Sequence, residues 1–182
     1  MSKVLTLFIL LTCMHTRINA QLYYTKNAAI SFFSRTSLQD IKADNNQAIS
    51  VLNIQSGTIQ LSLLNTAFHF PKAKMEEDFN EDYIESARYP KSTFKGTIAD
   101  IGKIDVGKNG SYSVKVNGDL MIHGVTKSIT VPATIIIKNG TLSASASFNV
   151  LAKDYNIRIP TIVENKIAEN IQITINCDYE KK

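Results

Sequence analysis

The residues best suited to catalysis or metal binding are few in this chain, and they are scattered. Beyond residue 20 the histidines are His69 and His123, and the cysteine is Cys177. A metal site needs three or four ligands at suitable spacing, and no cluster of histidine, cysteine and acidic residues provides them. The sequence also lacks a G-x-S-x-G turn for a serine nucleophile and a glycine-rich loop for phosphate. The residues therefore predict no enzyme, no metal site and no cofactor.

Three polar residues are candidates for a polar rim around a binding site. His69 lies in the run Phe68-His69-Phe70, immediately before a segment with a helical pattern. His123 and Lys127 lie at a short turn within residues 118–132, GDLMIHGVTKSITVP. Each side chain has two interpretations, a structural role at the end of a strand or a polar contact to a ligand head group.

Residues 72–87 form the one segment with a helical pattern. Met75, Phe79 and Tyr83 recur at four-residue spacing, and prolines lie just before and just after the segment. Asn80 is expected to divide the segment into two short pieces. We interpret the acidic residues of this segment as a solvated helix face, because the apolar residues define the opposite face. These acidic residues are Glu76, Glu77, Asp78, Glu81, Asp82 and Glu85.

From residue 91 onward apolar and polar residues alternate, which is the period of a strand with one buried face. Within residues 118–132 this alternation flanks a turn that we predict at 124–127. Asn109-Gly110 and Asn139-Gly140 are strong hairpin-turn dipeptides, because both central residues of that turn need positive φ. Each dipeptide also begins an N-glycosylation acceptor sequence, but the turn alone accounts for it.

Before residue 72 the strand patterns are shorter. We predict strands at 23–25 and 29–34, a polar turn at 44–47, and a hairpin of 48–55 and 58–65 around Ser56-Gly57. The last strand is predicted at 171–179. Cys177 lies on its apolar face, where a thiol behaves as a small buried hydrophobe.

These patterns predict an all-β fold. Its form is an extended antiparallel barrel of about eight strands with a short helical insert at 72–87, since closure removes the exposed edges of long strands. A two-sheet sandwich is the main alternative. A membrane barrel is disfavoured, because the polar strand faces carry lysine, aspartate and asparagine.

The first twenty residues are interpreted as a secretory signal peptide. Lys3 precedes a short apolar run at 4–14, and Ala20 offers a small residue for cleavage. The alternative is a lipoprotein signal ending at Cys13. Cleavage would leave a single domain, 21–182, with Cys177 as its one cysteine and no transmembrane segment. It would remove two basic residues from a formal net charge of +4, and no dense basic run indicates nucleic acid as a partner.

The apolar faces of the strands predict an interior that is either filled or hollow. Small residues on these faces, Gly96, Gly118, Ala144 and Ala146, favour a hollow interior. Ile59, Ile98, Val114, Leu142 and Ile173 belong to the same inward set. The predicted lining of a ligand site is Ile30, Phe32, Leu61, Leu63, Phe94, Val116, Leu120, Ile135 and Phe148.

Three motifs in the sequence resemble those of a known family. The first is FNEDYIES at 79–86, followed by RYP at 88–90 and TFKG at 93–96. The second is GDL at 118–120 with IHGVTK at 122–127, and the third is DYNI at 154–157 with IP at 159–160. Together they resemble the YceI-like proteins, which are lipocalin-like, polyisoprenoid-binding periplasmic proteins. The resemblance implies a barrel with an apolar interior for a long-chain isoprenoid or a similar amphiphile, in a bacterial envelope, and no catalytic activity.

The leading hypothesis is therefore a secreted or periplasmic binding protein whose barrel holds a long-chain apolar ligand, an isoprenoid or another lipid. The alternative is a filled barrel that acts as a protein-interaction or stress-response module without lipid cargo, with its function on the rim near 123–127. An enzyme would need a polar pocket around His69, His123 and an acidic residue. Nothing in the sequence indicates an oligomeric state.

Overall fold

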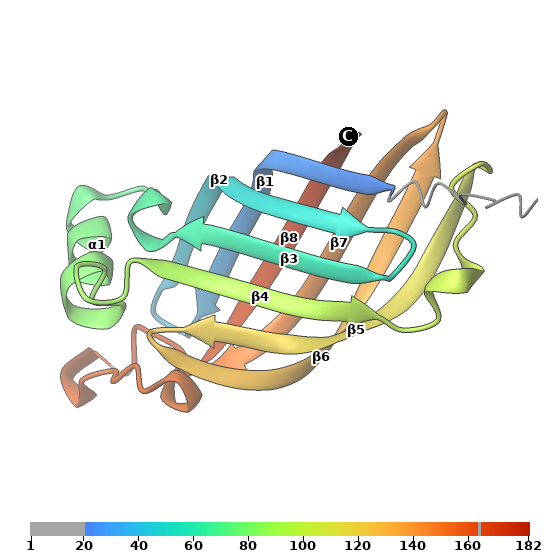
Figure 1. Ribbon diagram of the computed structural model, residues 1–182. Coiled ribbons are helices and arrows are strands. Elements are labelled where there is room, and N and C mark those ends of the chain that lie inside the picture. Colours follow the sequence, from blue (N-terminus) through green and yellow to red (C-terminus); the bar gives the residue numbers. More distant parts are fainter. Residues whose placement is uncertain (1–20, 164) are drawn as a thin grey trace, which may run out of the picture.

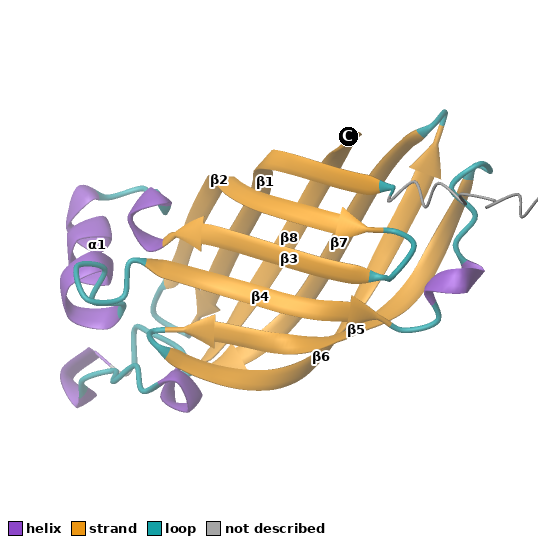
Figure 2. Cartoon of the chain, in the orientation of Figure 1, coloured by secondary structure: helices purple, strands orange, loops and turns teal. Residues whose placement is uncertain are grey.

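The chain folds into a closed antiparallel β-barrel with the strand order β1 to β8 (Figures 1 and 2). The computed structural model describes residues 21–163 and 165–182. The predicted signal peptide and Cys13 lie outside the described residues. Each strand pairs with the next one along the chain, and β8 pairs with β1 to close the barrel. The prediction of an all-β barrel of about eight strands is confirmed.

The strands are long, and short helical turns connect several of them. The strands are β1 (Leu22–Arg35), β2 (Asp40–Asn53), β3 (Thr58–Leu64), β4 (Lys91–Ile98), β5 (Gly110–Ile122), β6 (Val125–Lys138), β7 (Thr141–Leu151) and β8 (Asn170–Lys181). The helical elements are η1 (Asn65–Ala67), α1 (Ala73–Asp78), η2 (Phe79–Tyr83), η3 (Ile101–Lys103), η4 (Ala152–Tyr155) and η5 (Thr161–Val163).

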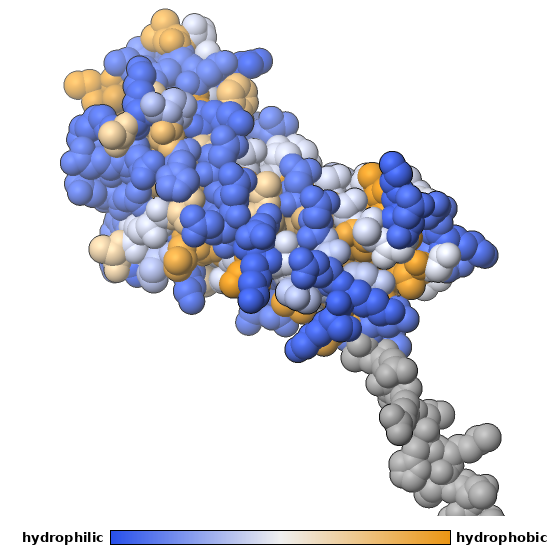
Figure 3. Space-filling model, turned by 90° about the horizontal axis from the view of Figure 1, so that it is seen from above, coloured by the Kyte–Doolittle hydropathy of each residue, from blue (hydrophilic) through white to orange (hydrophobic). Residues whose placement is uncertain are grey.

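The two ends of the barrel differ. α1 and the connection between β7 and β8 lie at one end, and the C-terminus lies toward the other (Figure 1). The C-terminal end is packed solid, because large apolar side chains there are almost fully buried. They include Leu52, Ile98, Ile135 and Leu142. The face of the barrel seen in Figure 3 is mostly hydrophilic with scattered apolar residues, as the alternating strands predict.

The first two strands correct the sequence prediction. β1 is one continuous strand with register shifts between Thr25 and Ile30, and β2 runs straight through the predicted turn at 44–47. The polar residues there form a bulge. The Asn45 amide donates to the Leu64 carbonyl, and its oxygen accepts from the Gln47 amide, so Asn45 is buried but fully hydrogen-bonded.

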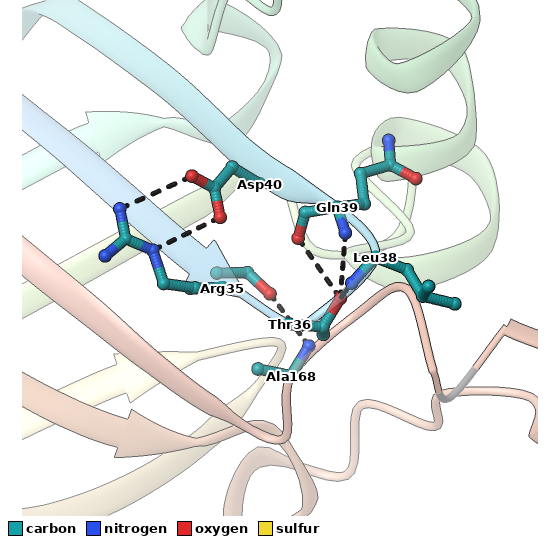
Figure 4. Close-up of polar contacts among 7 residues, drawn as sticks. Arg35, Thr36, Leu38, Gln39, Asp40 and Ala168 are labelled. Atoms are coloured by element: carbon teal, nitrogen blue, oxygen red, sulfur yellow. Dashed lines mark hydrogen bonds and ion pairs between the residues drawn. The ribbon is translucent and has the colours of Figure 1, made fainter.

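The true turn between β1 and β2 lies at 36–39. The Thr36 hydroxyl accepts hydrogen bonds from the backbone amides of Leu38 and Gln39, and Arg35 pairs with Asp40 across the turn (Figure 4). Thr36 thus supplies the local hydrogen bonds of the turn between the first two strands, which the sequence analysis placed at 44–47.

Two of the predicted hairpin turns also change. The β5–β6 turn is the two-residue turn His123-Gly124, with φ of 51° and 73°, so Thr126 and Lys127 belong to β6. Asn139-Gly140 makes the predicted turn with φ of 51° and 79°. Asn109-Gly110 does not form a hairpin turn, because β4 ends at Ile98 and a longer connection, residues 99–109, leads to β5. Instead, Asn109 Oδ1 accepts from the Asn139 amide and supports the neighbouring turn.

The predicted helix at 72–87 is shorter and irregular. α1 ends at Asp78 and continues as the single π-turn η2, which contains Asn80. The Asn80 side-chain amide donates to the Glu76 carbonyl, and its oxygen accepts from the Ser86 hydroxyl. This side chain competes for backbone partners, which explains the predicted division near Asn80.

Candidate functional site

A cavity of about 420 Å³ extends from the middle of the barrel to its helical end. Every strand contributes side chains to it, and they are overwhelmingly apolar. This volume is within the range of cavities that enclose small organic ligands, roughly 300–1,000 Å³. The barrel is thus hollow at one end and solid at the other.

The structure places most of the predicted lining at this cavity. Ile135 is the exception, because it is buried in the solid end and does not reach the cavity. The others, Ile30, Phe32, Leu61, Leu63, Phe94, Val116, Leu120 and Phe148, all line it. The sequence analysis missed the part of the lining that comes from the two connections at the helical end.

The small inward residues have two different roles. Ala144 and Ala146 on β7 line the cavity and leave space in it. Gly96 and Gly118 are paired across β4 and β5, but the Phe94 ring occupies the space above them. A Cβ atom on Gly96 would lie 2.7 Å from Phe94 Cζ. These glycines therefore accommodate an aromatic ring and do not enlarge the cavity.

Cys177 and Tyr179 line the inner part of this cavity, and the Tyr179 hydroxyl bonds to Ser50 on β2. The hydroxyls of Ser50 and Tyr179 are 2.8 Å apart, and the Ser50 hydroxyl also donates to the Gln60 carbonyl. Burial raises the pKa of the Cys177 thiol and of the Tyr179 phenol above their usual values, so both groups are neutral near pH 7. Cys177 is a buried free thiol, as its position on the apolar face predicts.

One side of the cavity mouth is the connection between β3 and β4, which carries α1 and η2. Four phenylalanines attach it to β1, with ring centroids 5.2–5.6 Å apart between neighbours. They are Phe32 on β1 and Phe68, Phe70 and Phe79 on the connection, and all four line the cavity. Aromatic pairs at these distances attract one another beyond the effect of burial alone. This side of the mouth is therefore held by aromatic packing.

The other side of the mouth is the connection between β7 and β8. β6 pairs with β7 only from Ala133 onward, so the first half of β6 has no strand partner on that side. η4 contacts both β6 and β7 there, and Tyr155 and Ile157 reach the cavity. The Ser34 hydroxyl accepts from the Ala168 amide and ties the far end of the connection to β1 (Figure 4). This connection therefore completes the wall where the strands separate.

His123 joins the two sides of the mouth. It is only 7% exposed, and its Nδ1 lies 3.0 Å from the Tyr155 carbonyl oxygen. Its Nε2 lies 3.0 Å from Glu85 Oε1, and the Tyr89 ring packs edge-on at a centroid distance of 4.4 Å. Glu85 and Tyr89 belong to one side of the mouth, and Tyr155 belongs to the other. The next residue, Gly124, has no room for a Cβ atom beneath the Tyr89 ring.

One known family matches the part of the chain that contains nearly all of the barrel and the three motifs. The model of the YceI-like domain matches residues 14–179, which is most of the chain. The chain belongs to the YceI-like family.

Solved structures show the YceI-like fold at low sequence identity. A polyisoprenoid-binding domain from Saccharophagus degradans, described as implicated in plant cell wall breakdown, superposes with a TM-score of 0.77 at 16% identity over 90% of this chain and 99% of that chain. BcnA from Burkholderia cenocepacia gives 0.70 at 18% identity over 84% and 96%, respectively. A Campylobacter jejuni YceI protein gives 0.57 at 18% identity over 75% and 80%.

A UPF0312 protein of Vibrio parahaemolyticus is 29% identical over 85 residues. The match spans 46% of this chain and 41% of that protein, so this chain covers less than half of that relative.

The three motifs of the YceI-like resemblance converge on His123. The first motif supplies Glu85 and Tyr89, the second supplies His123 and Gly124, and the third supplies Tyr155. Sequence analysis could not bring these residues together, because their contacts depend on the closure of the barrel. The signal that pointed to them was the presence of polar and aromatic residues that strand alternation did not explain.

The candidate rim residues of this YceI-like barrel do not form one site. His123 is buried, so its assignment to an exposed polar rim is corrected. Its ring fits inside because both nitrogens have hydrogen-bond partners. The His69 side chain is 66% exposed and lies 3.6 Å from Glu76, and Lys127 is exposed on β6. Nothing in the structure explains the presence of Thr126 and Lys127 at these positions.

The acidic residues around α1 form ordinary surface pairs. Lys74 lies 3.1 Å from Glu77 and 2.9 Å from Asp78, and these carboxylates raise the pKa of its ammonium group. Across residues 21–163 and 165–182, no group of three or more histidine, cysteine or acidic residues is arranged to hold a metal ion. Within the same residues, no helix has the length and apolar character needed to cross a membrane.

Proposed function

We propose that this YceI-like barrel binds one long-chain apolar molecule, an isoprenoid or another lipid, in the cavity at its helical end. The observation that carries the proposal is the cavity itself, which has apolar side chains from all eight strands of the described barrel. Burying a hydrocarbon chain is favourable by about 0.8 kcal/mol per methylene, so affinity requires few polar contacts.

The distribution of polar groups indicates how such a molecule would lie. Tyr179, at the inner part of the cavity, already bonds to Ser50, and no buried side-chain nitrogen or oxygen of the described residues lacks a partner. A polar group delivered there would gain little, because it would have to break these bonds. At the mouth, Gln39, Asp78 and Lys166 line the opening. We infer that the apolar tail enters first and that the polar head remains at the mouth.

An isoprenoid is the cargo class that the comparisons favour. The Saccharophagus degradans domain is described as polyisoprenoid-binding, and its fold matches this chain over most of both chains. A branched, flexible isoprenoid chain also suits a lining of isoleucine, leucine and phenylalanine with four alanines. The signal-like residues 1–20 and the family membership support a place in the bacterial envelope, in the periplasm or outside the cell.

The alternative, a filled barrel that acts as an interaction or stress-response module, is less well supported. It requires a solid interior, and only one end of this barrel is solid. The non-enzymatic role remains part of our proposal, since Cys177 and Tyr179, the titratable groups at the inner part of the cavity, are kept neutral by burial.

A variant that fills the cavity tests the proposal. Delipidated wild-type protein should bind the uncharged probe diphenylhexatriene saturably, with one site per chain, and the probe should fluoresce on leaving water. Ala146→Phe should weaken this binding at least about tenfold, because the ring takes the space of the probe. The absence of saturable binding to the wild type would contradict the proposal.

The control is Ser147→Phe. This change adds the same ring at the next residue of β7, where the side chain is exposed. The control should bind the probe as the wild type does. Circular dichroism and the unfolding midpoint of both variants distinguish a filled cavity from a failure to fold. If both variants fold and bind equally well, the cavity is not the binding site.

A further inference from the structure

The hydrogen bonds of His123 require one more proton than a neutral histidine and an ionised glutamate carry. Nδ1 faces the Tyr155 carbonyl oxygen and Nε2 faces Glu85 Oε1, each at 3.0 Å. A carbonyl oxygen can only accept, and so can an ionised carboxylate. A neutral imidazole has a single N–H group. Both hydrogen bonds therefore exist together only when the His123–Glu85 pair holds an additional proton.

This pair connects the two segments that form the mouth of the cavity. Ile84, the neighbour of Glu85, lines the cavity from the β3–β4 connection, and Tyr155 lines it from the β7–β8 connection. His123 lies between them in a two-residue turn that β5 and β6 hold in place. Glu85 itself has a φ of 47°, an uncommon conformation for glutamate that brings its carboxylate to the ring. Loss of the Glu85 contact would remove the hydrogen bond between the β3–β4 connection and His123 and leave the Tyr89 ring contact.

Few other charged groups face the imidazole. On the β3–β4 connection, Arg88 Nη1 lies 3.7 Å from Glu85 Oε2, the carboxylate oxygen that His123 does not contact, and the Tyr89 ring covers one side. On the β7–β8 connection, burial raises the pKa of the Tyr155 phenol above its usual value, and Asp154 raises it further, so this phenol is neutral near pH 7. An imidazole is the side chain whose charge normally changes between about pH 5 and 8.

We propose that the proton shared by His123 and Glu85 is a latch that holds the mouth of the barrel closed. With the proton present, the imidazolium donates to both connections and fixes them over the cavity. Without it, the single N–H group can serve only one of the two acceptors, so a ring lone pair faces either the Glu85 carboxylate or the Tyr155 carbonyl oxygen, and one of the two connections loses its bond to His123. His123 is thus a positioning residue for the cavity mouth. Its role in controlling cargo exchange rests on the proposed function, whereas the hydrogen-bond requirement does not.

The test is the dissociation rate of diphenylhexatriene from the protein between pH 5.5 and 8.0. The probe has no charge, so its own chemistry doesn't change over this range. Wild-type protein should release it on the order of tenfold faster at pH 8.0, the factor expected for loss of one charge-assisted hydrogen bond. Glu85→Gln should show a nearly flat profile, because the glutamine amide can donate to the unprotonated Nε2.

The matched control is Glu81→Gln, which removes an exposed carboxylate from the same connection and makes no contact with His123. It should keep the pH profile of the wild type. A flat wild-type profile, or the same pH dependence in Glu85→Gln as in the wild type, would overturn the proposal.

A second measurement separates the latch from the proposed function. Nitrogen-15 chemical shifts of His123 should show both ring nitrogens protonated at pH 5.5 and only one protonated at pH 8.0. Backbone amide exchange in 84–89 or in 154–157, compared with Glu85→Gln at each pH, should rise over the same range. If the protein binds no probe but both changes occur, the latch stands and the cargo proposal fails. A single ring N–H at pH 5.5 together with an ionised Glu85 carboxylate, seen by its carbon-13 shift, contradicts the latch, whatever the probe does.

Discussion

At the scale of single residues, the space around a side chain decides its role more than its type does. Gly96 and Gly118 looked like empty space inside the barrel, but the Phe94 ring lies over both of them. A Cβ atom on Gly118 would meet the Lys95 carbonyl oxygen and would lie 2.6 Å from Gly96 Cα. Backbone atoms of a paired strand cannot move aside as a flexible side chain can. The glycine at position 118 is therefore required for β4 and β5 to pair beneath the ring.

Gly118→Ala is expected to lower the free energy of unfolding by about 1–3 kcal/mol, the usual cost of forcing an extra carbon into a packed site. Urea denaturation measures the effect as a lower midpoint. Gly102→Ala is the control, because a Cβ atom there meets nothing within 4 Å. It should leave the stability unchanged or raise it by up to about 1 kcal/mol. Equal midpoints for both variants would show that the close approach at Gly118 can be relieved at no cost.

Strand alternation identified most of the residues of the site but not its organisation. Ile30, Leu61 and Val116 face inward because each lies on the apolar side of its strand, and that side follows from the period of two. The burial of His123 could not be inferred in this way. Its partners, Glu85 and Tyr155, come from two distant connections, and only barrel closure brings them to the same turn.

At the scale of elements, the aromatic cluster explains how an irregular connection can close a barrel. α1 has only six residues, so it cannot be stable by itself. Phe79 follows it directly and contacts Phe32, Phe68 and Phe70. The helix is therefore held by tertiary packing at its C-terminal end.

Phe79→Ala should release α1 from the barrel. We expect a loss of about 2–3 kcal/mol, somewhat below the cost for a fully buried phenylalanine because Phe79 is partly exposed. Limited proteolysis should cut within residues 73–88 faster than in the wild type, and diphenylhexatriene should dissociate faster. Phe33→Ala is the control, since Phe33 lies next to Phe32 on β1 but outside the cluster. Equal cleavage rates in the two variants would show that the cluster does not hold α1.

The elements also show where sequence patterns fail for physical reasons. The later strands were predicted well, because each has one apolar and one polar face and the β6–β7 turn has an Asn-Gly pair. β2 was broken at 44–47 in the prediction because a buried, fully bonded Asn45 has the sequence appearance of a turn. Asn109-Gly110 was misread for a similar reason, since Asn109 bonds to a turn in another part of the chain. In both cases a long-range hydrogen bond satisfies a polar group that local rules assign to a turn.

At the scale of the whole molecule, the barrel divides into a solid end and a hollow end. Large side chains such as Leu52, Ile135 and Leu142 fill the end near the C-terminus, and this packing supplies the core that a domain without a disulfide needs. At the other end, Ala144 and Ala146 on β7 leave space that the cargo fills in our account. Sequence composition predicts how many apolar residues face inward, but their volumes at each level of the barrel decide which end is hollow.

The most direct test of this account is the chemical identity of whatever the protein carries. The protein should be purified from the envelope fraction of its own host without detergent, extracted with organic solvent, and the extract analysed by mass spectrometry, with Ala146→Phe treated in parallel. The account predicts close to one long-chain apolar molecule per wild-type chain, with an isoprenoid mass series, and a strongly reduced amount in Ala146→Phe. An extract of folded wild-type protein that contains no such molecule, or the same amount in both proteins, would contradict it.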